Sequence, residues 1–205
     1  MNKFTRFVVC TMMAPLTVVV AAQAASASAE KKNLVDVSVT YSGLRTNAPV
    51  GGSDIFWMQG GSGELAIPVW RGLSLVGAVD GRRVGTIPNF NVGQSRVAGL
   101  GGVRVRVPTH TLFQPFAQAM VGGVHGFDSY FPAPTGRYPT TYDTSFAMTL
   151  GGGVDLAVSK HVWIRVVQAD YFYTGLRNLD GNRQNQIRIG GGVVVRFPHW
   201  LWERQ

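Results

Sequence analysis

Apolar and polar residues alternate along most of this chain with a repeat of two. The segment that ends at Phe197 shows the pattern clearly. From Ile187 onward every second residue is apolar or glycine, while the positions between them include Arg188 and Arg196. Successive side chains of a strand point to opposite faces, so this pattern predicts a strand with one apolar and one charged face. The two faces must lie against different media.

Eight segments of this kind follow one another, and helical periodicity is hard to find between them. An even number of strands lets an antiparallel sheet close on itself with both ends on the same side. The fold class that we predict is therefore all-β, an eight-stranded antiparallel up-and-down barrel. The predicted strands are residues 34–44, 55–67, 73–83, 95–107, 113–124, 144–157, 162–173 and 184–197.

The connections between the predicted strands alternate in length. Those after the second, fourth and sixth strands are short ("PVWRG", "PTHTL" and "VSKH"), whereas the others are longer and rich in Gly, Pro, Asn and Asp. This asymmetry is typical of bacterial outer-membrane barrels, which have short periplasmic turns and long external loops. The apolar face would then meet lipid and the charged face would point inward. Without water in the bilayer core, only a helix or a closed barrel pairs every backbone group.

The predicted strand at 95–107 fixes its own register. Its lipid side carries valine and glycine, and its other side carries Arg96, Arg104 and Arg106. A slip of one residue would move these arginines into lipid, at about 2–4 kcal/mol each near the midplane. A soluble β-sandwich or lipocalin-like barrel also alternates and stays open as an alternative. The scarcity of lysine, with only Lys31, Lys32 and Lys160 beyond the leader, favours the membrane barrel.

The first 27 residues have the features of a secretory signal peptide. A positive start is followed by a short apolar stretch and by small residues, and cleavage is expected after Ala27, with Ala24 or Ala29 as alternatives. A retained transmembrane helix is the competing interpretation, but the stretch is short and contains Pro15. The domains expected are a signal peptide (1–27), a short segment (28–33), the barrel (34–197) and a tail (198–205).

Composition adds little chemistry to this picture. The single cysteine, Cys10, lies in the leader, so the mature chain has no disulfide and no thiolate metal site. Removing Lys3 and Arg6 with the leader lowers the formal charge from +8 to +6 (8 − 2). The remaining arginines are spread singly along the chain, which argues against a nucleic-acid partner. No cluster of His, Asp or Glu has metal-ligand spacing, and we expect no metal and no cofactor.

The interior of an eight-stranded barrel is only wide enough for side chains, so its charges must pair with one another. Glu64 and Arg104 each lie four residues before a proline at a short turn, at a similar height. We predict a charge network centred on these two residues. Its other predicted members are Asp80, Arg106, Asp155, Arg165 and Arg188, and the inward face also offers Asp36, Arg82, Arg96 and Arg196.

Strand 162–173 resists simple alternation. If Arg165 faces inward, Gln168 and Asp170 face lipid, unless a β-bulge between Arg165 and Gln168 reverses the parity. The sequence leaves this question open. Aromatic residues near the strand ends predict a girdle at the outer membrane surface. Its predicted members are Tyr41, Trp57, Tyr171 and Tyr173.

Several stretches resemble the small eight-stranded barrels of the OmpA/OmpX-like outer-membrane family. They are the leader, "FQPFAQAMVGGVHG", "LGGGVDLAVSKHVWIRVVQADYFYTG" and the closing strand, and the resemblance spans residues 34–197. It implies an outer-membrane location, a monomer, contact with membrane lipid and lipopolysaccharide, and periplasmic chaperones during biogenesis. It also implies that Phe197 serves as the assembly signal read by the barrel-assembly machinery. The tail "PHWLWERQ" departs from the family pattern because it makes this signal internal, and Trp200 and Trp202 are candidates for the periplasmic headgroup level.

The resemblance raises the question of catalysis, because some such barrels modify lipids. His125, near Asp128 and Ser129, is the one histidine at the external rim, and we expect no catalytic residues and no enzyme. The predicted role is structural or surface-interacting, through the long loops and an unknown extracellular ligand. A narrow or gated pore is the alternative, and a lipid-modifying enzyme is a third. Candidates for surface contacts are Tyr130, Phe131, Tyr138 and Tyr142, and candidates for lipopolysaccharide phosphates are Arg45, Arg83, Arg137, Arg177 and Arg183.

Overall fold

The structure, a computed structural model, describes residues 34–47, 55–87, 92–109, 111–129, 131, 140–177 and 183–198. The predicted leader, the segment 28–33 and the tail from residue 199 lie outside the described residues. No helix in these ranges is long and apolar enough to cross a membrane.

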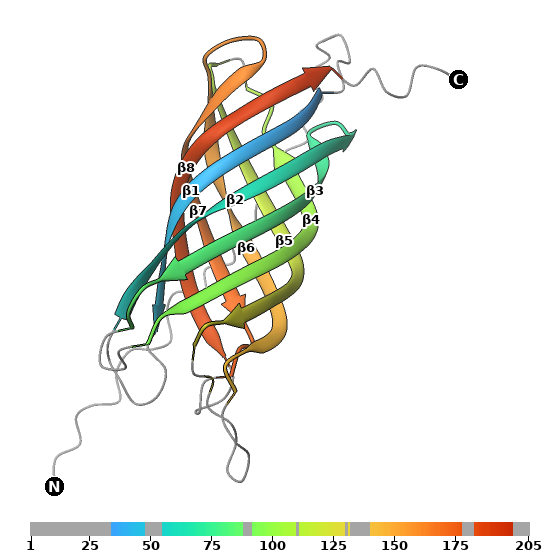
Figure 1. Ribbon diagram of the computed structural model, residues 1–205. Coiled ribbons are helices and arrows are strands. Elements are labelled where there is room, and N and C mark those ends of the chain that lie inside the picture. The colour runs from blue at the N-terminus through green and yellow to red at the C-terminus, as the bar shows by residue number, and fades with distance from the viewer. Residues whose placement is uncertain are drawn as a thin grey trace, which may run out of the picture. The chain divides into compact units, whose positions relative to one another are not determined.

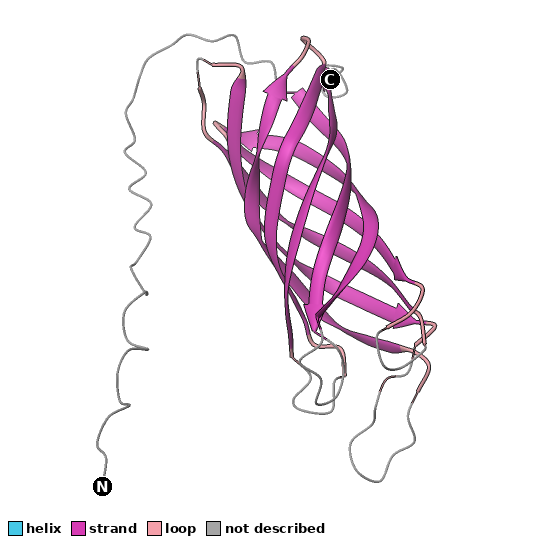
Figure 2. Cartoon of the chain, turned by 90° about the vertical axis from the view of Figure 1, so that its left-hand side faces the viewer, coloured by secondary structure: helices cyan, strands magenta, loops and turns pink. Residues whose placement is uncertain are grey.

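Eight antiparallel strands follow one another around a closed barrel, and the first strand pairs with the last (Figure 1). The all-β barrel that the alternation predicted is therefore confirmed. The strands cross the barrel obliquely and form an elongated tube (Figure 2). They are β1 (Leu34–Asn47), β2 (Ile55–Trp70), β3 (Leu73–Val84), β4 (Gln94–Arg106), β5 (Phe113–Phe127), β6 (Asp143–Ala157), β7 (Val162–Thr174) and β8 (Gln184–Pro198).

The end of β2 differs from the prediction. The sequence placed a turn at Pro68, but the strand continues to Trp70 with an irregular register between Pro68 and Trp70. Proline cannot donate to the ladder, so it is tolerated where regular pairing breaks down near a strand end. The turn itself is reduced to Arg71 and Gly72. Gly72 has a φ of 73°, which glycine adopts without steric cost.

The two rims of the barrel differ as the connection lengths predicted. One rim, called here the turn end, carries the connections 71–72, 107–112 and 158–161, and the paired ends of β1 and β8. The other rim, called the loop end, carries the connections 48–54, 85–93, 128–142 and 175–183. In Figure 1 the turn end is at the top.

The distribution of apolar and charged side chains is the reverse of that in a water-soluble protein. On the exterior, Val39 is 66% exposed and Leu150 is 60% exposed, whereas inside the barrel Arg104 and Asp155 are fully buried. A soluble fold would bury the aliphatic side chains and expose the charges. The outward-facing apolar stretch on most strands is roughly 9–11 residues long, the length that a tilted strand needs to cross the hydrocarbon core. The exterior is therefore built to face lipid.

Close contact between strands depends on glycine at a few inward positions. A Cβ atom on Gly102 of β4 would collide with the backbone of Ala119, and one on Gly122 of β5 would collide with the backbone of Gly99. These two glycines let β4 and β5 coil tightly around the barrel, because backbones approach where no side chain intervenes.

The bulge that the sequence left open is present in β7. The register between β7 and β8 shifts between Arg165 and Gln168, and Val166 and Val167 are both exposed on the exterior. One extra residue reverses the side-chain parity. As a result Arg165, Gln168 and Asp170 all point into the barrel and are all buried.

An arginine placed on the exterior tests the lipid-facing assignment. Leu150 lies in the middle of β6, and Val158 lies in the turn that follows; the two are 60% and 59% exposed. Leu150→Arg should lower the free energy of unfolding in lipid vesicles by about 2–4 kcal/mol, and Val158→Arg by less than about 1 kcal/mol, since the cost depends on depth. Equal effects of the two substitutions in denaturant titrations would show that the exterior faces water.

Candidate functional site in the barrel interior

The interior of the barrel is densely charged. Among the described residues between the loop rim and the turn end, five carboxylates and seven arginines point inward, which leaves a surplus of two positive charges (7 − 5). Buried charges are tolerated only when they are paired and hydrogen-bonded, so their arrangement determines whether the barrel is stable. The carboxylates are Asp36, Glu64, Asp80, Asp155 and Asp170, and the arginines are Arg82, Arg96, Arg104, Arg106, Arg165, Arg188 and Arg196.

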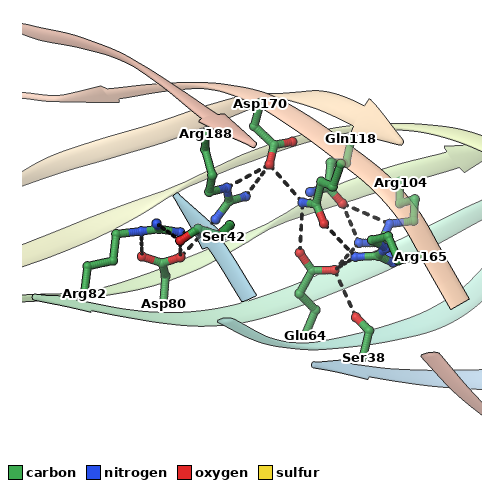
Figure 3. Close-up of polar contacts among 11 residues, drawn as sticks. Ser38, Ser42, Glu64, Asp80, Arg82, Arg104, Gln118, Arg165, Asp170 and Arg188 are labelled. Carbon is green, nitrogen blue, oxygen red and sulfur yellow. Dashed lines mark hydrogen bonds and ion pairs between the residues drawn. The ribbon is translucent and has the colours of Figure 1, made fainter. Parts of the chain in front are cut away.

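A central cluster consists of Glu64, Arg104, Arg165 and Asp155, which come from four different strands. The Glu64 carboxylate accepts hydrogen bonds from Arg104 Nη2 at 2.5 Å and from Arg165 Nη1 at 2.7 Å (Figure 3). Arg165 Nε donates to Asp155 Oδ1 at 3.0 Å. Two negative and two positive charges therefore balance within the cluster, and its bonds join β2, β4, β6 and β7 across the lumen.

Neutral side chains complete the hydrogen bonding of the central cluster. Ser38 Oγ donates to Glu64 Oε2 at 3.1 Å, and Gln118 Oε1 accepts hydrogen bonds from Arg104. Buried carboxylates and guanidinium groups need several partners each, because desolvation otherwise exceeds the attraction between the charges.

Phe116 of β5 lies beside the two arginines of the central cluster. The guanidinium carbons of Arg104 and Arg165 lie 4.6 Å and 4.5 Å from the centre of its ring. The ring face attracts both cations and fills space beside them. Gly153 makes room for the ring, since a Cβ atom there would lie 2.9 Å from Phe116 Cζ. Phe116 was not predicted from the sequence, although its inward parity on β5 was a usable signal.

A loop-side cluster consists of Asp80, Arg82, Asp170 and Arg188, and it is also balanced. Arg82 Nε lies 2.7 Å from Asp80 Oδ1. Arg188 pairs with two carboxylates, since its Nη1 lies 3.1 Å from Asp80 Oδ2 and its Nη2 lies 2.6 Å from Asp170 Oδ2. Gln168 connects this cluster to the central one, because its amide donates to Asp170 at 2.8 Å and lies 3.4 Å from Glu64 Oε1. The two clusters thus form one continuous polar plug (Figure 3).

The two surplus positive charges lie at opposite ends of this plug. Toward the loop end, Arg96 donates to Gln186 Oε1 at 2.9 Å and lies 2.6 Å from Met58 Sδ, with no carboxylate partner among the described residues. At the turn end, Asp36 pairs with both Arg106 and Arg196, the second at 3.3 Å. The excess charge is therefore kept out of the middle of the barrel.

A cavity of about 240 Å³ lies at the turn end, beside these last three residues. Its lining includes no member of the central or loop-side cluster. Arg196 is held there by Gln114 Oε1 at 2.7 Å and by the ring of Trp163, whose centre lies 3.6 Å from the guanidinium carbon. The cavity therefore stays at the turn end and does not reach either cluster. The residues that line it are Asp36, Pro68, Trp70, Gly72, Ser74, Arg106, Pro108, Gln114 and Arg196.

The structure divides the predicted charge network into three parts. Glu64, Arg104, Asp155 and Arg165 lie together, but Asp80 and Arg188 belong to the loop-side cluster, and Arg106 pairs with Asp36 at the turn end. The sequence left the parity of Gln168 and Asp170 open, because it depends on the bulge. No feature of the sequence predicted that the network divides into three parts, because the division depends on how far each side chain reaches across the lumen.

The other predicted residues lie on the outer surface. Tyr41, Trp57 and Tyr171 are exposed on the exterior toward the loop end, and Tyr173 beside them is half-buried. The phenol of Tyr171 donates to Asn185 Oδ1 at 2.6 Å. Phe197 is exposed on the exterior at the turn end, and its role in assembly stays a prediction. Trp200 and Trp202 lie outside the described residues.

His125 lies on the exterior near the loop end. Its Nδ1 atom is 2.7 Å from Thr144 Oγ1, and its ring stacks on Phe127 with centroids 5.9 Å apart. No group of three or more His, Cys, Asp or Glu residues that could hold a metal occurs in the described part of the chain. His110 and His199 lie outside it.

The balance of the central cluster gives a stability prediction. Glu64→Gln leaves Arg104 and Arg165 with one carboxylate between them and should lower the free energy of unfolding by about 3–5 kcal/mol. Adding Arg104→Gln restores the balance, since Arg165 keeps Asp155. The double variant should therefore be more stable than Glu64→Gln alone in denaturant titrations and in heat-modifiability gels. Additive losses in the two variants would contradict the cluster.

Comparison with known proteins identifies the fold but no close relative. No family model matches the sequence, and no curated protein matches it. Among solved structures, Neisserial surface protein A is similar, with a TM-score of 0.62, 15% identity, and coverage of 80% of this chain and 97% of that one. Ail, the attachment invasion locus protein of Yersinia pestis, gives a TM-score of 0.52, 14% identity, and coverage of 81% and 99%.

At these identities the similarity concerns the fold. The closed all-antiparallel topology, the apolar exterior and the charged interior agree with the outer-membrane location that the sequence predicts. The chain therefore has the fold of the small eight-stranded outer-membrane β-barrel proteins.

Proposed function

We propose that this protein is a small outer-membrane barrel that is sealed by its own side chains and acts through the surface at its loop end. The observation that carries this proposal is the polar plug formed by the central and loop-side clusters. Glu64 on β2 is bonded to side chains from β4 and β7, and Asp80 on β3 is bonded to one from β8. These bonds cross the lumen, so they obstruct it rather than line it.

Burial supports a closed interior. Arg104, Arg165 and Asp155 expose at most 1% of their surface, although they are among the most strongly hydrated side chains when free. In an open aqueous channel these groups would contact water along the pore. A barrel of eight strands is also too narrow to hold both these side chains and a continuous water column. Transport of solutes through the resting barrel is therefore the weaker candidate.

The loop end offers the surface for interaction, and part of it is structured. Phe131 pairs with Thr140 as an isolated bridge inside the longest connection, and Ser129 is buried at its base. Phe131 itself is only 2% exposed, so it anchors the loop and does not supply contact area as the sequence suggested. Tyr142 is 61% exposed and keeps that role. Tyr130 and Tyr138 lie outside the described residues.

The solved structures of similar fold agree with a surface role. One is named a surface protein, and the other is named for attachment and invasion and was solved with the heparin analogue sucrose octasulfate. Loops on a rigid barrel can change without loss of the fold, which suits a protein that displays contact residues.

Conductance measurements test the sealed interior. In planar bilayers the wild-type barrel should give no steady openings. A Glu64→Ala/Arg104→Ala variant removes one charge of each sign and empties part of the central cluster, so it should give small openings and serve as the positive control. Steady conductance by the wild-type protein would contradict the proposal and favour the pore.

The lipid-modifying alternative makes a different prediction. His125 and Thr144 form a hydrogen-bonded base and hydroxyl, which is part of what acyl transfer needs. We expect His125→Ala to leave the lipid A composition of the cells unchanged, as judged by mass spectrometry against cells that carry the wild-type gene and cells that lack it. A lipid species present only with wild-type protein would instead show that the protein is an enzyme.

A further inference from the structure

Charged residues on the lipid-facing side of the barrel gather at one end. Within the described strands, Arg45 of β1 and Arg83 of β3 are the exposed charged residues on this side, and both lie close to the loop end. At the turn end the same side of the strands finishes in apolar residues such as Val69 and Phe197. The exposed positive charges of the described strands thus lie near the loop end only.

The register places the two arginines around a single glutamine. Gln59 of β2 lies opposite Gly43 on β1 and opposite Arg83 on β3, while Arg45 lies opposite Trp57, two residues closer to the loop end. Neighbouring strands are about 4.8 Å apart, so the two arginine Cα atoms are separated by roughly two strand spacings and a two-residue offset. Both guanidinium groups can reach one ligand above Gln59. The strands that carry them, β1 and β3, lie on either side of β2 in Figure 1.

The glutamine is oriented so that it adds a donor. The phenol of Tyr41 donates to Gln59 Oε1 at 2.6 Å, which fixes the amide and leaves its Nε2–H groups to donate elsewhere. By register, two arginine side chains and this amide come from neighbouring positions on the outer wall. Such a set of donors matches a phosphate, because planar guanidinium groups form paired, charge-assisted hydrogen bonds to its oxygens.

The height of these residues indicates where the phosphate comes from. Toward the turn end, the next outward positions are Gly61 on β2 and Gly81 on β3, which pair directly and begin the uncharged exterior. A Cβ atom built on Gly81 would meet no atom within 4 Å, so a large headgroup has room to approach. Tyr41 and Trp57 mark the same level, where amphipathic rings prefer the boundary between headgroups and hydrocarbon. A phosphate at this depth belongs to a lipid.

We propose that Arg45, Gln59 and Arg83 form a binding site for the phosphate of a lipopolysaccharide lipid A moiety in the outer leaflet. This proposal rests on the proposed function, in which the loop end of the barrel lies outside the cell. It deepens the expectation of lipopolysaccharide contact by assigning it to the outer wall of β1, β2 and β3. Lipid bound at this wall would help to hold the barrel at a fixed depth in the membrane.

Native mass spectrometry of the barrel, released from nanodiscs that contain bis-phosphorylated lipid A, tests the site. The Arg45→Gln/Arg83→Gln variant should retain roughly tenfold less lipid A than the wild type, because it loses both charge-assisted partners. The matched control, Arg71→Gln/Lys160→Gln, removes the same charge from exposed turns at the opposite end and should bind like the wild type. An Arg45→Lys/Arg83→Lys variant keeps the charge and should recover most of the binding. Heat-modifiability gels verify folding of every variant.

Three results would overturn the site. They are equal retention by the glutamine double variant and the wild type, equal retention of fully dephosphorylated lipid A, and complete displacement of lipid A by an equal concentration of inorganic phosphate, which would indicate a site for free anions. Conductance by the wild-type barrel would overturn the sealed interior and leave this measurement unaffected. The two proposals therefore fail separately.

Discussion

The absence of water from the bilayer core is the constraint on which this structure depends. Backbone donors and acceptors that would be hydrated in solution must pair within the protein, and a barrel whose first and last strands pair leaves no edge. The same constraint divides the side chains by parity. Aliphatic residues such as Val39 and Leu150 are exposed outside, while the arginines and carboxylates are turned inward and buried. Strand register then becomes strongly fixed, since a slip of one residue would exchange the two sets.

Turning the charges inward creates a second requirement, because a narrow lumen without bulk water must neutralise them. The central and loop-side clusters each contain two acids and two arginines, and the unmatched charges lie toward the ends, at Arg96 and beside Asp36. The bulge in β7 belongs to the same solution, because it brings Arg165, Gln168 and Asp170 to the inner side together. The central and loop-side clusters therefore both stabilise the barrel and close its lumen. Evolution of a pore from this barrel would have to remove bonds that also hold the wall together.

The sequence predicted what local parity determines. The eight strands, the inward acids and arginines, and the contact between Glu64 and Arg104 all follow from alternation and from distance to a turn. Features that depend on reach across the lumen were not predictable, such as the contact of Phe116 with two arginines and the assignment of Arg106 to Asp36. The continuation of β2 past Pro68 was missed because proline usually ends regular pairing. The burial of Phe131 was missed because a loop can fold back on its own base.

The central claim is that lipid surrounds the barrel and that its ionic residues are enclosed. Spin labels at single cysteines replacing Val39, Val79 and Leu150 test it directly, since the one natural cysteine, Cys10, lies in the predicted leader. With the protein in lipid vesicles, collision of each label with oxygen and with a water-soluble nickel chelate would be measured. The account predicts high oxygen accessibility and almost no access of the chelate at all three positions. Ready collision with the chelate, equal to that of a label at Val158 in the turn, would contradict it.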